Sequence, residues 1–495
     1  MAQPEQRQCP GEPAPISVAI CRGRQLRNYE KCADCSQRDE DISRKAVKAE
    51  TAGAYERVFK AYDVRGVYPS EINEQMSEQI GGAIARFLNA KTMVVSRDMR
   101  LSGEKLSRSL IQGILTAGSD VIDCGLLSTD ANYFAIATLE ASGGVQVTAS
   151  HNPAEYNGFK VSRESAIPMG SDSGLDNVKR IALGPPLRPS RDRGRLEKAD
   201  ILPKFASHVL SFVRNPAPFK VAIDAGNGMA GKMLPPILAK LPLEVVPLFF
   251  ELDGSFPNHE ANPLKPENMK DLQEAVRAKG CDFGVAFDGD ADRCMFTDET
   301  GQIIPSDLMT ALLAGRMLDR SKGAAVCYDL RSSRVVAEEI RKHGGVPVIE
   351  RVGHAFMKAT MRRRNAIFGG ELSGHYYFRD NFFADSGAIA FMELINVLSI
   401  ARRPLSEMLQ PLRRYFATGE INFEVENKDE KMRRLAEVFK DGKVSKLDGV
   451  TVEYDDWWFN VRASNTEPKL RLNLEAASQE LMEQSKKRVV DVILE

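Results

Sequence analysis

Short apolar runs alternate with amphipathic stretches along most of this 495-residue chain. Such runs, bounded by turn-forming residues, are typical of buried strands, and the stretches between them repeat apolar positions at helical spacing. This alternation predicts an α/β protein whose βα units build parallel or mixed sheets. The clearest strand candidates are residues 92–96, 145–148, 220–224, 283–288 and 324–329.

The pattern changes in the C-terminal part of the chain. At residues 451–454, 458–462 and 469–475, apolar and polar positions alternate as in a half-buried antiparallel sheet. In the third run the leucines would face a core, whereas Asn473 would face solvent. Residues 478–495 have the spacing of an amphipathic helix, so we expect a smaller sheet-and-helix domain here.

Three domain boundaries are expected along the chain. The first is a linker with three prolines and several arginines at 183–195, and the others are expected near Thr300 and at 413–420. Residues 1–50 mix Pro, Gly, Gln and charge with little apolar periodicity, which is typical of an appendage. The predicted segments are 1–50, 51–197, 198–300, 301–414 and 415–495, and no internal sequence repeat is visible.

Composition argues against some partners. There are 67 Lys and Arg against 68 Asp and Glu, a formal net charge of −1, so no global field attracts nucleic acid or an anionic membrane. The most apolar helical stretch, 387–400, is too short for a bilayer and carries Glu393. The N-terminus lacks the pattern of a secretory signal. We therefore expect a cytoplasmic protein that binds neither nucleic acid nor membrane.

The eight cysteines fall into two groups. Four are scattered through apolar-rich segments, as reduced core thiols are. The other four crowd the N-terminus and include one Cys-x-x-Cys pair, so they could bind a structural zinc ion. Their irregular spacing leaves a tail with incidental cysteines as the alternative. The scattered thiols are Cys124, Cys281, Cys294 and Cys327, and the crowded ones are Cys9, Cys21, Cys32 and Cys35.

A single hydroxyl is delivered to a turn after the strand that ends near Val147. Ser150 is followed by His151-Asn152-Pro153, and Lys160 comes ten residues after it. A serine nucleophile or phosphate carrier would be placed in this way. The alternative is an ordinary Ser/Asn turn or helix cap.

Three alternating carboxylates, Asp288, Asp290 and Asp292, follow another predicted strand. Carboxylate oxygens at this spacing can converge on one hard cation, and they favour Mg²⁺ over zinc or copper. An EF-hand is excluded, because Arg293 stands where that loop requires glycine and a strand comes before it. A solvated acidic turn is the alternative, but unneutralised carboxylates this close would repel one another.

A glycine motif offers a function of a different class. Residues 226–231 match G-x-G-x-x-G after a strand, with Glu251 where a ribose-binding acid would stand. A nicotinamide-dependent oxidoreductase is one interpretation. The other is a tight strand-to-helix turn, since one such match is weak support.

Two further loops carry polar groups. Glu371 and Ser373, between glycines, are spaced so that both could bind adjacent sugar hydroxyls. Residues 462–468 combine a guanidinium, hydroxyls, an amide and backbone N–H groups, which suits a phosphate, although a polar hairpin turn is equally consistent. The candidate phosphate-binding residues are Arg462, Ser464, Asn465 and Thr466.

These four motifs, in this order, resemble the α-D-phosphohexomutase superfamily, and most closely its bacterial phosphomannomutase/phosphoglucomutase branch. The resemblance runs from about Tyr55 to the C-terminus. It also includes residues 59–66, 256–259 and 262–268. It implies four domains around a central cleft: three related α/β domains with mixed sheets and a smaller C-terminal α+β domain. The first three would supply the phosphoserine, metal and sugar-binding loops, and the fourth a phosphate-binding loop.

The resemblance also implies residue roles. Ser150 would be the phosphoserine, and its phosphate would join the three aspartates in binding Mg²⁺. One departure is Arg331, where a lysine that helps to hold substrate is expected, so the substrate geometry can differ. The groups around the transferring phosphoryl would be Arg65, His151, Lys160, Arg293 and His354, and those that bind or line the substrate would be Tyr62, Arg331, Glu371, Ser373, Arg462, Ser464, Asn465 and Thr466.

The implied activity is reversible phosphoryl transfer between the 1- and 6-positions of a mannose or glucose phosphate, through a hexose 1,6-bisphosphate. A phosphatase could use the same parts, but loops from four distant segments can exclude water around a bisphosphate. Phosphoglucosamine mutase is less favoured, since its members tend to open with Gly-Thr-Asp-Gly rather than Ala61-Tyr62-Asp63. A zinc-linked interaction protein with a mutase-like body is a third alternative. We expect a monomer or weak dimer with a small phosphosugar substrate.

Overall fold

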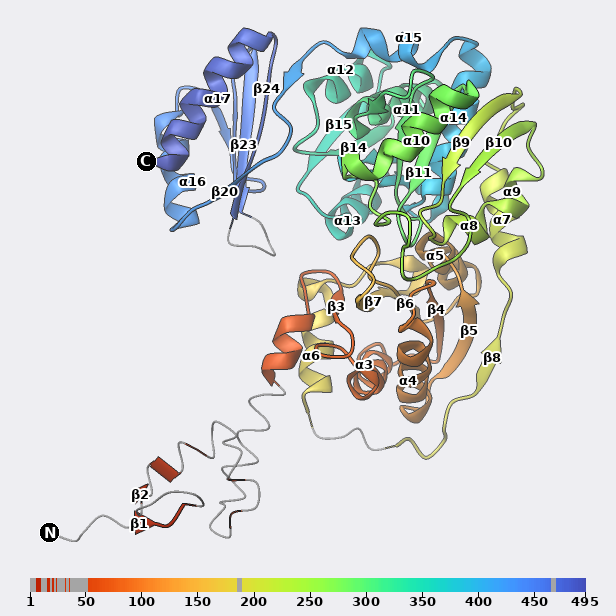
Figure 1. Ribbon diagram of the computed structural model, residues 1–495, viewed down its shortest axis with the longest axis vertical. Helices are drawn as coiled ribbons and strands as arrows, with labels where there is room; N and C mark the ends of the chain where they lie inside the picture. The colour runs from red at the N-terminus through yellow and green to blue at the C-terminus, as the bar shows by residue number, and fades with distance from the viewer. Residues whose placement is uncertain are drawn as a thin grey trace, which may run out of the picture.

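The computed structural model describes residues 6–9, 16–17, 20–21, 24, 32, 35, 52–184, 189–463 and 469–495. The described residues from 52 onward form four domains, three related α/β domains with mixed sheets and a smaller C-terminal α+β domain (Figure 1). The architecture that the resemblance implied is therefore confirmed. Within the described ranges, no helix combines the length and the apolar character that crossing a bilayer requires.

The first domain contains a six-stranded sheet in the order β3-β7-β6-β4-β5-β8. Strands β6, β4, β5 and β8 are parallel, and β7 is antiparallel to both of its neighbours. The strands are β3 (Val64–Val67), β4 (Thr92–Arg97), β5 (Asp120–Leu126), β6 (Gly143–Val147), β7 (Tyr156–Arg163) and β8 (Leu196–Lys198). The helices are α3 (Glu74–Phe87), α4 (Gly103–Thr116), α5 (Thr129–Thr138) and α6 (Leu175–Ala182), with short 3₁₀ turns at Glu164–Ala166 and Ser171–Ser173.

The second domain repeats the central part of this plan with the order β10-β9-β11-β12-β13. Strands β10, β9 and β11 are parallel, and β12 reverses direction. The strands are β9 (Phe219–Asp224), β10 (Leu243–Leu248), β11 (Phe283–Phe287), β12 (Cys294–Thr297) and β13 (Ile303–Ile304). The helices are α7 (Leu202–Leu210), α8 (Ala230–Met233), α9 (Pro235–Leu238) and α10 (Lys270–Lys279), with a 3₁₀ turn at Pro266–Met269.

The third domain has the same topology again, β15-β14-β16-β17-β18, with β17 as the reversing strand. The strands are β14 (Ala325–Asp329), β15 (Val346–Glu350), β16 (Phe368–Gly370), β17 (Tyr376–Phe378) and β18 (Ala384–Asp385). The helices are α11 (Ser306–Arg320), α12 (Arg334–Lys342), α13 (His354–Arg364), α14 (Gly387–Ala401) and α15 (Leu405–Leu409), with 3₁₀ turns at Arg379–Asn381 and Gln410–Leu412.

The fourth domain is an antiparallel sheet in the order β19-β24-β23-β22-β21, with β20 also paired to β24. Helices α16 and α17 lie on one side of this sheet (Figure 1). The strands are β19 (Phe416–Ala417), β20 (Ile421–Glu424), β21 (Lys443–Ser445), β22 (Val450–Glu453), β23 (Trp457–Ala463) and β24 (Lys469–Ala476). The helices are α16 (Lys428–Val438) and α17 (Gln479–Leu494).

The five strand candidates correspond to β4, β6, β9, β11 and β14, so the prediction of parallel and mixed sheets is confirmed. The expectation for Asn473 is wrong, because its side chain is only 6% exposed. Glu475, two residues along the same face of β24, accepts from the Arg334 backbone N–H at 3.0 Å. This face of the fourth domain therefore packs against the third domain instead of meeting solvent.

Helix α14 is mostly apolar because it is internal. Every residue from Gly387 to Leu398 is buried, and one hydrophobic cluster joins the helix to the cores of the second and third domains. Ser386 caps the N-terminus by accepting from Ile389 N–H at 3.2 Å. Burial on all sides, rather than a membrane, explains this stretch of sequence.

The three related domains place one loop at an equivalent position. It connects the last parallel strand to the strand that reverses direction: β6 to β7, β11 to β12, and β16 to β17. These loops carry the serine, aspartate and glutamate motifs, respectively. The shared topology therefore places a serine, three aspartates and a glutamate at the same end of their respective sheets.

Candidate active site

Ser150 lies at the boundary between the first two domains. It is 2% exposed, and its backbone is left-handed, with φ 51°. The Ser150 N–H donates to the Thr148 hydroxyl at 2.8 Å, and the Ser150 Oγ donates to Asp288 Oδ2 at 2.9 Å, although 138 residues separate these two positions. The predicted phosphate carrier and the predicted metal loop are thus in direct contact.

Arg100, which sequence reasoning missed, holds the serine loop in shape. Its side chain is 2% exposed and forms an ion pair with Asp98 at 3.3 Å. Its guanidinium donates to the carbonyl oxygens of Ser150, Asn152, Pro153 and Tyr156 at 2.5–2.9 Å. Because one buried guanidinium fixes carbonyls on both sides of the turn, Arg100 stabilises the turn that presents the hydroxyl.

Arg100→Met is expected to lower the free energy of unfolding by about 3–5 kcal/mol, since it leaves Asp98 buried without its cation and removes the hydrogen bonds from the guanidinium to the turn. Chemical denaturation measures this loss. Arg108→Met is the matched control, because the Arg108 side chain is 79% exposed, and it should change stability by no more than about 0.5 kcal/mol. Equal denaturation midpoints for Arg100→Met and Arg108→Met would contradict the role given to Arg100.

The three aspartates form a compact group of buried carboxylates. One oxygen from each of Asp288, Asp290 and Asp292 lies within 4.8 Å of the others. The Oδ1 atoms of Asp290 and Asp292 are buried and have no hydrogen-bond partner. Buried carboxylate oxygens without partners are costly, so the residues fit a hard divalent cation such as Mg²⁺.

Cationic side chains surround the same point. Arg293 Nη2 donates to Ser150 Oγ at 2.7 Å and contacts His151 Nδ1, while Arg293 Nε donates to Asp288 Oδ2 at 3.0 Å. Lys160 Nζ donates to Asp290 Oδ2 at 2.7 Å and to Asp292 Oδ2 at 2.5 Å. Burial favours the neutral amine, but the aspartates raise the pKa of Lys160. A phosphoryl group on Ser150 would therefore meet two fixed positive charges.

The glycine motif has a structural role. Met229 N–H, in the loop that follows β9, donates to the Gly289 carbonyl at 2.9 Å, and a Cβ at Gly228 would lie 2.8 Å from the same oxygen. Helix α8, which follows, has only four residues, too short for the dinucleotide-binding turn that opens a full helix. These glycines serve close packing against the metal loop.

The sugar-binding candidates lie beside the metal loop. Glu371 accepts from Tyr377 Oη at 2.8 Å and from Ser373 Oγ at 3.1 Å, and burial raises the pKa of Glu371 to about 7. His375, which ends the same sequence motif and was not selected from sequence, has Nε2 3.7 Å from Asp292 Oδ1. Its Nδ1 lies 2.9 Å from Ser373 Oγ. This histidine therefore connects the third-domain loop to the metal loop.

The first and third domains also meet through aromatic rings. Tyr62 packs edge-on to His354, with ring centroids 5.3 Å apart, and His354 stacks on His375 at 6.2 Å. Arg65 donates to Asn152 Oδ1 at 2.7 Å and to Asp63 Oδ2 at 2.5 Å. Burial lowers the pKa of His354 well below its usual range, so the imidazole is neutral at pH 7.

Arginines from two domains converge on Glu420. Arg462 donates to Glu420 Oε2 at 3.1 Å, Arg471 donates to Oε1 at 3.1 Å, and Arg331 Nη1 lies 3.7 Å from Oε2. Arg331 also forms a two-point contact with Asp329. Glu420 went unnoticed in the sequence because no motif surrounds it. Three further candidates, Ser464, Asn465 and Thr466, lie outside the described residues.

A buried carboxyl gives one domain contact a pH dependence. Asp130 accepts from Ser386 Oγ of the third domain at 2.5 Å, and burial raises the pKa of Asp130 from 3.8 to about 7. Between pH 3.8 and about pH 7, Asp130 of the folded chain holds a proton that Asp130 of the unfolded chain has released. Stability from this group is therefore full below about pH 4 and is lost as the pH rises to about 7.

Asp130→Asn should consequently gain stability relative to wild type as the pH rises through that window, with a slope of up to about 1.4 kcal/mol per pH unit. Parallel denaturation of the two proteins at several pH values measures the difference. If the free energies of unfolding of the two proteins changed equally with pH from pH 4 to pH 7, the raised pKa of Asp130 would be contradicted.

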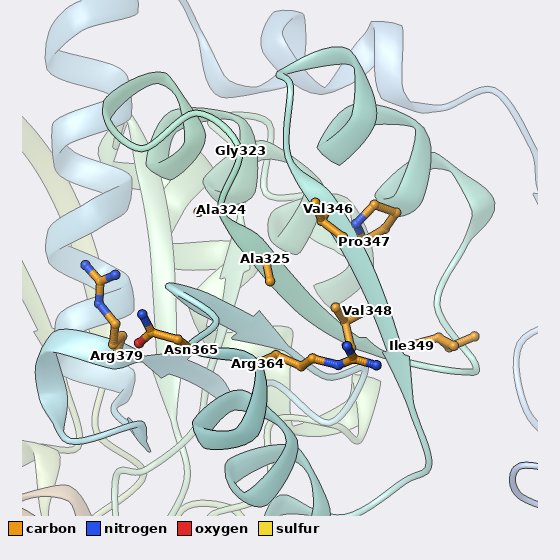
Figure 2. Close-up of a pocket in the computed structure, with 10 residues that line it drawn as sticks. All are labelled: Gly323, Ala324, Ala325, Val346, Pro347, Val348, Ile349, Arg364, Asn365 and Arg379. Carbon is orange, nitrogen blue, oxygen red and sulfur yellow. The ribbon is translucent and has the colours of Figure 1, made fainter.

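A separate depression lies at the outer edge of the third sheet, where β15 is the edge strand (Figure 2). Val346, Val348, Ile349 and Arg364 are among the residues that line it. None of the motif residues does so, and the site is therefore assigned to the loops described above.

Family models of phosphoglucomutase/phosphomannomutase match four consecutive parts of the chain. Alpha/beta/alpha domains I, II and III match residues 56–182, 203–301 and 305–415, and the C-terminal domain matches 420–492. A phosphomannomutase of Escherichia coli K12 is 40% identical over 431 residues, which is 84% of this chain and 94% of that protein. One from Vibrio cholerae is 39% identical over 435 residues, with the same two coverages.

A solved structure shows the same similarity in three dimensions. The X-ray structure of a phosphoglucomutase/phosphomannomutase family protein from Burkholderia thailandensis has a TM-score of 0.82 and 32% sequence identity. The match covers 88% of this chain and 96% of that protein.

Proposed function

Because the chain belongs to the phosphoglucomutase/phosphomannomutase family, we propose that it moves a phosphoryl group reversibly between the 1- and 6-positions of mannose or glucose. It is a phosphohexomutase, an isomerase by reaction type. The parts of this function that we propose are the substrate, the phosphoserine at Ser150 and the hexose 1,6-bisphosphate intermediate.

One observation carries the proposal: Ser150 Oγ lies 2.9 Å from Asp288 Oδ2 and 2.7 Å from Arg293 Nη2. A phosphoryl group on this oxygen would lie between a divalent cation and a guanidinium. Phosphoryl transfer depends mainly on positioning and charge neutralisation, and this arrangement offers both.

In the proposed reaction, a hydroxyl oxygen of the bound hexose phosphate attacks the phosphorus on Ser150. The new P–O bond forms as the bond to Ser150 Oγ breaks, and the hydroxyl proton passes to a neighbouring base. His151 and His354 are the candidates for that base, and Arg65 and Lys160 would contact the phosphoryl oxygens. The resulting 1,6-bisphosphate turns end over end and returns its other phosphoryl group to Ser150.

Mg²⁺, held by Asp288, Asp290, Asp292 and a phosphoserine oxygen, would neutralise charge that develops on the transferred group. The protein's own groups orient the sugar. Glu371 and Ser373 would bind its hydroxyls, and Tyr62 would line the cleft. The distal phosphate would be bound by Arg331, Arg462, Ser464, Asn465 and Thr466. Binding that phosphate could supply part of the roughly 7–11 kcal/mol available from preorganised orientation.

A coupled assay with mannose 1-phosphate, glucose 1-phosphate and glucosamine 1-phosphate, each with a trace of bisphosphate, tests the substrate. We expect kcat/KM for mannose or glucose phosphate to exceed that for glucosamine phosphate by at least about tenfold, because relatives 39–40% identical to this chain are phosphomannomutases. A preference for glucosamine would favour phosphoglucosamine mutase instead. Release of inorganic phosphate at the same rate would favour a phosphatase.

We also propose the division 1–50, 51–197, 198–300, 301–414 and 415–495 for the extension and the four domains. A reducing, cytoplasmic setting suits the buried free thiols at Cys124, Cys281, Cys294 and Cys327. We also propose a monomer or weak dimer, because loops from two domains of one chain already meet at Ser150 Oγ and Asp288 Oδ2.

A further inference from the structure

Four cysteines lie in an N-terminal segment that precedes the parts of the chain matched by the family models, which begin at residue 56. The described residues here include a hairpin in which β1 (Gln6–Arg7) pairs antiparallel with β2 (Ile16–Ser17). In Figure 1 this hairpin lies apart from the four domains. Any function of these thiols is therefore separate from phosphoryl transfer.

Among the residues of this segment that the structure describes, the buried side chains are those of cysteines. The side chains of Cys9, Cys21 and Cys32 are 4%, 5% and 7% exposed, whereas Ile20 is 52% exposed. A segment this short cannot form a stable aliphatic core and commonly relies on disulfides or a metal. The cysteines thus occupy the place that a hydrophobic core would take in a larger domain.

The four thiols are also near one another, although up to 26 residues separate them. Burial raises the pKa of Cys32, and Cys9, Cys21 and Cys35 all lie near enough to raise it further. All four cysteines are free thiols. Arg24 Nη1 donates to Cys9 Sγ at 3.4 Å, which is the kind of contact that stabilises a thiolate ligand.

We propose that Cys9, Cys21, Cys32 and Cys35 bind one structural zinc ion in a tetrahedral four-thiolate site. The Cys-x-x-Cys pair at 32 and 35 supplies the closely spaced ligands, and Cys9 and Cys21 close the site from the hairpin side. No three of these sulfurs lie within 4.8 Å of one another, so the ion would draw them to the S–S separation of about 3.8 Å that Zn–S bonds require.

Zinc would bind as the thiols release their protons, and its binding energy would fold the extension. No oxidant is needed, which distinguishes this site from a pair of disulfides. The site requires no contact with the active-site loops, and loss of the zinc should therefore leave mutase turnover unchanged.

The test uses the full chain, purified under reducing conditions and dialysed against excess Mg²⁺ so that the aspartate site holds no zinc. Elemental analysis is expected to find about one zinc per chain in wild type and less than about a tenth in Cys32→Ser/Cys35→Ser. Cys281→Ser, which removes a thiol from the second domain, should keep the zinc. All three proteins should show the same mutase rate.

A second measurement reports on ligand type. Cobalt replacing the zinc should give an intense sulfur-to-metal absorption that the double variant lacks. Zinc absent from wild type with none taken up on titration would overturn the proposal. So would zinc retained by the double variant, or non-reduced mass spectra showing the four thiols paired as disulfides.

Discussion

Ser150→Ala is expected to lower mutase turnover by at least about a thousandfold, the scale on which enzymes respond to loss of a covalent nucleophile. Only the Ser150 hydroxyl is removed, and it is the oxygen that lies between Asp288 and Arg293. The fold should persist, since Arg100 holds the loop through backbone carbonyls that the variant retains. A bisphosphate-primed coupled assay measures the rate, and thermal unfolding measures the fold.

Ser485→Ala is the matched control, because Ser485 is equally buried at 2% exposure but lies on α17 of the fourth domain. It should retain wild-type turnover. Full activity in Ser150→Ala would refute the phosphoserine role, and an unfolded variant would refute the view that Arg100 suffices to hold the loop.

Asp290→Asn is expected to lower turnover by about a hundredfold and to raise the Mg²⁺ concentration needed for half-maximal rate. The cation's charge is worth several kcal/mol in the transition state, and each ~1.4 kcal/mol changes the rate tenfold. Asparagine keeps the size of the side chain and can still accept from Thr129 and Lys160, which contact Asp290 in the structure. The loss is therefore mainly one of negative charge.

A magnesium titration of the coupled assay measures both effects. Asp282→Asn is the control, since Asp282 is exposed at the start of β11, where it accepts from the Lys220 N–H at 2.7 Å. An unchanged titration for Asp290→Asn would count against the metal loop, even if the rate fell.

The sequence predicted the fold class and the motif residues because both depend on local signals. Apolar runs bounded by turns located β4, β6, β9, β11 and β14, and three alternating aspartates after a strand indicated a cation site. These local signals did not indicate an internal repeat in the sequence. The structure shows the same central strand arrangement three times, with a motif-bearing loop at the same position in each domain, because a fold can recur without any residue recurring.

Residues that act through long-range contacts escaped prediction. Arg100 lies 50 or more positions from the carbonyls that it binds, and Glu420 accepts from arginines 42 and 51 residues away. Neither belongs to a recognisable motif. His375 differs, since it ends the motif that contains Glu371 and Ser373, and a closer look at that loop could have selected it. Asn473 was misjudged because strand alternation alone does not say that a neighbouring domain covers the polar face.

The central claim is that Ser150 carries the phosphoryl group that the sugar receives. Wild-type enzyme would be loaded with hexose 1,6-bisphosphate bearing labelled phosphate, and peptide mass spectrometry would locate the label before and after a chase with unlabelled hexose 6-phosphate. The account predicts label on the peptide containing Ser150 and its transfer to bisphosphate during the chase. Label on another residue, or label that leaves Ser150 only as inorganic phosphate, would contradict it.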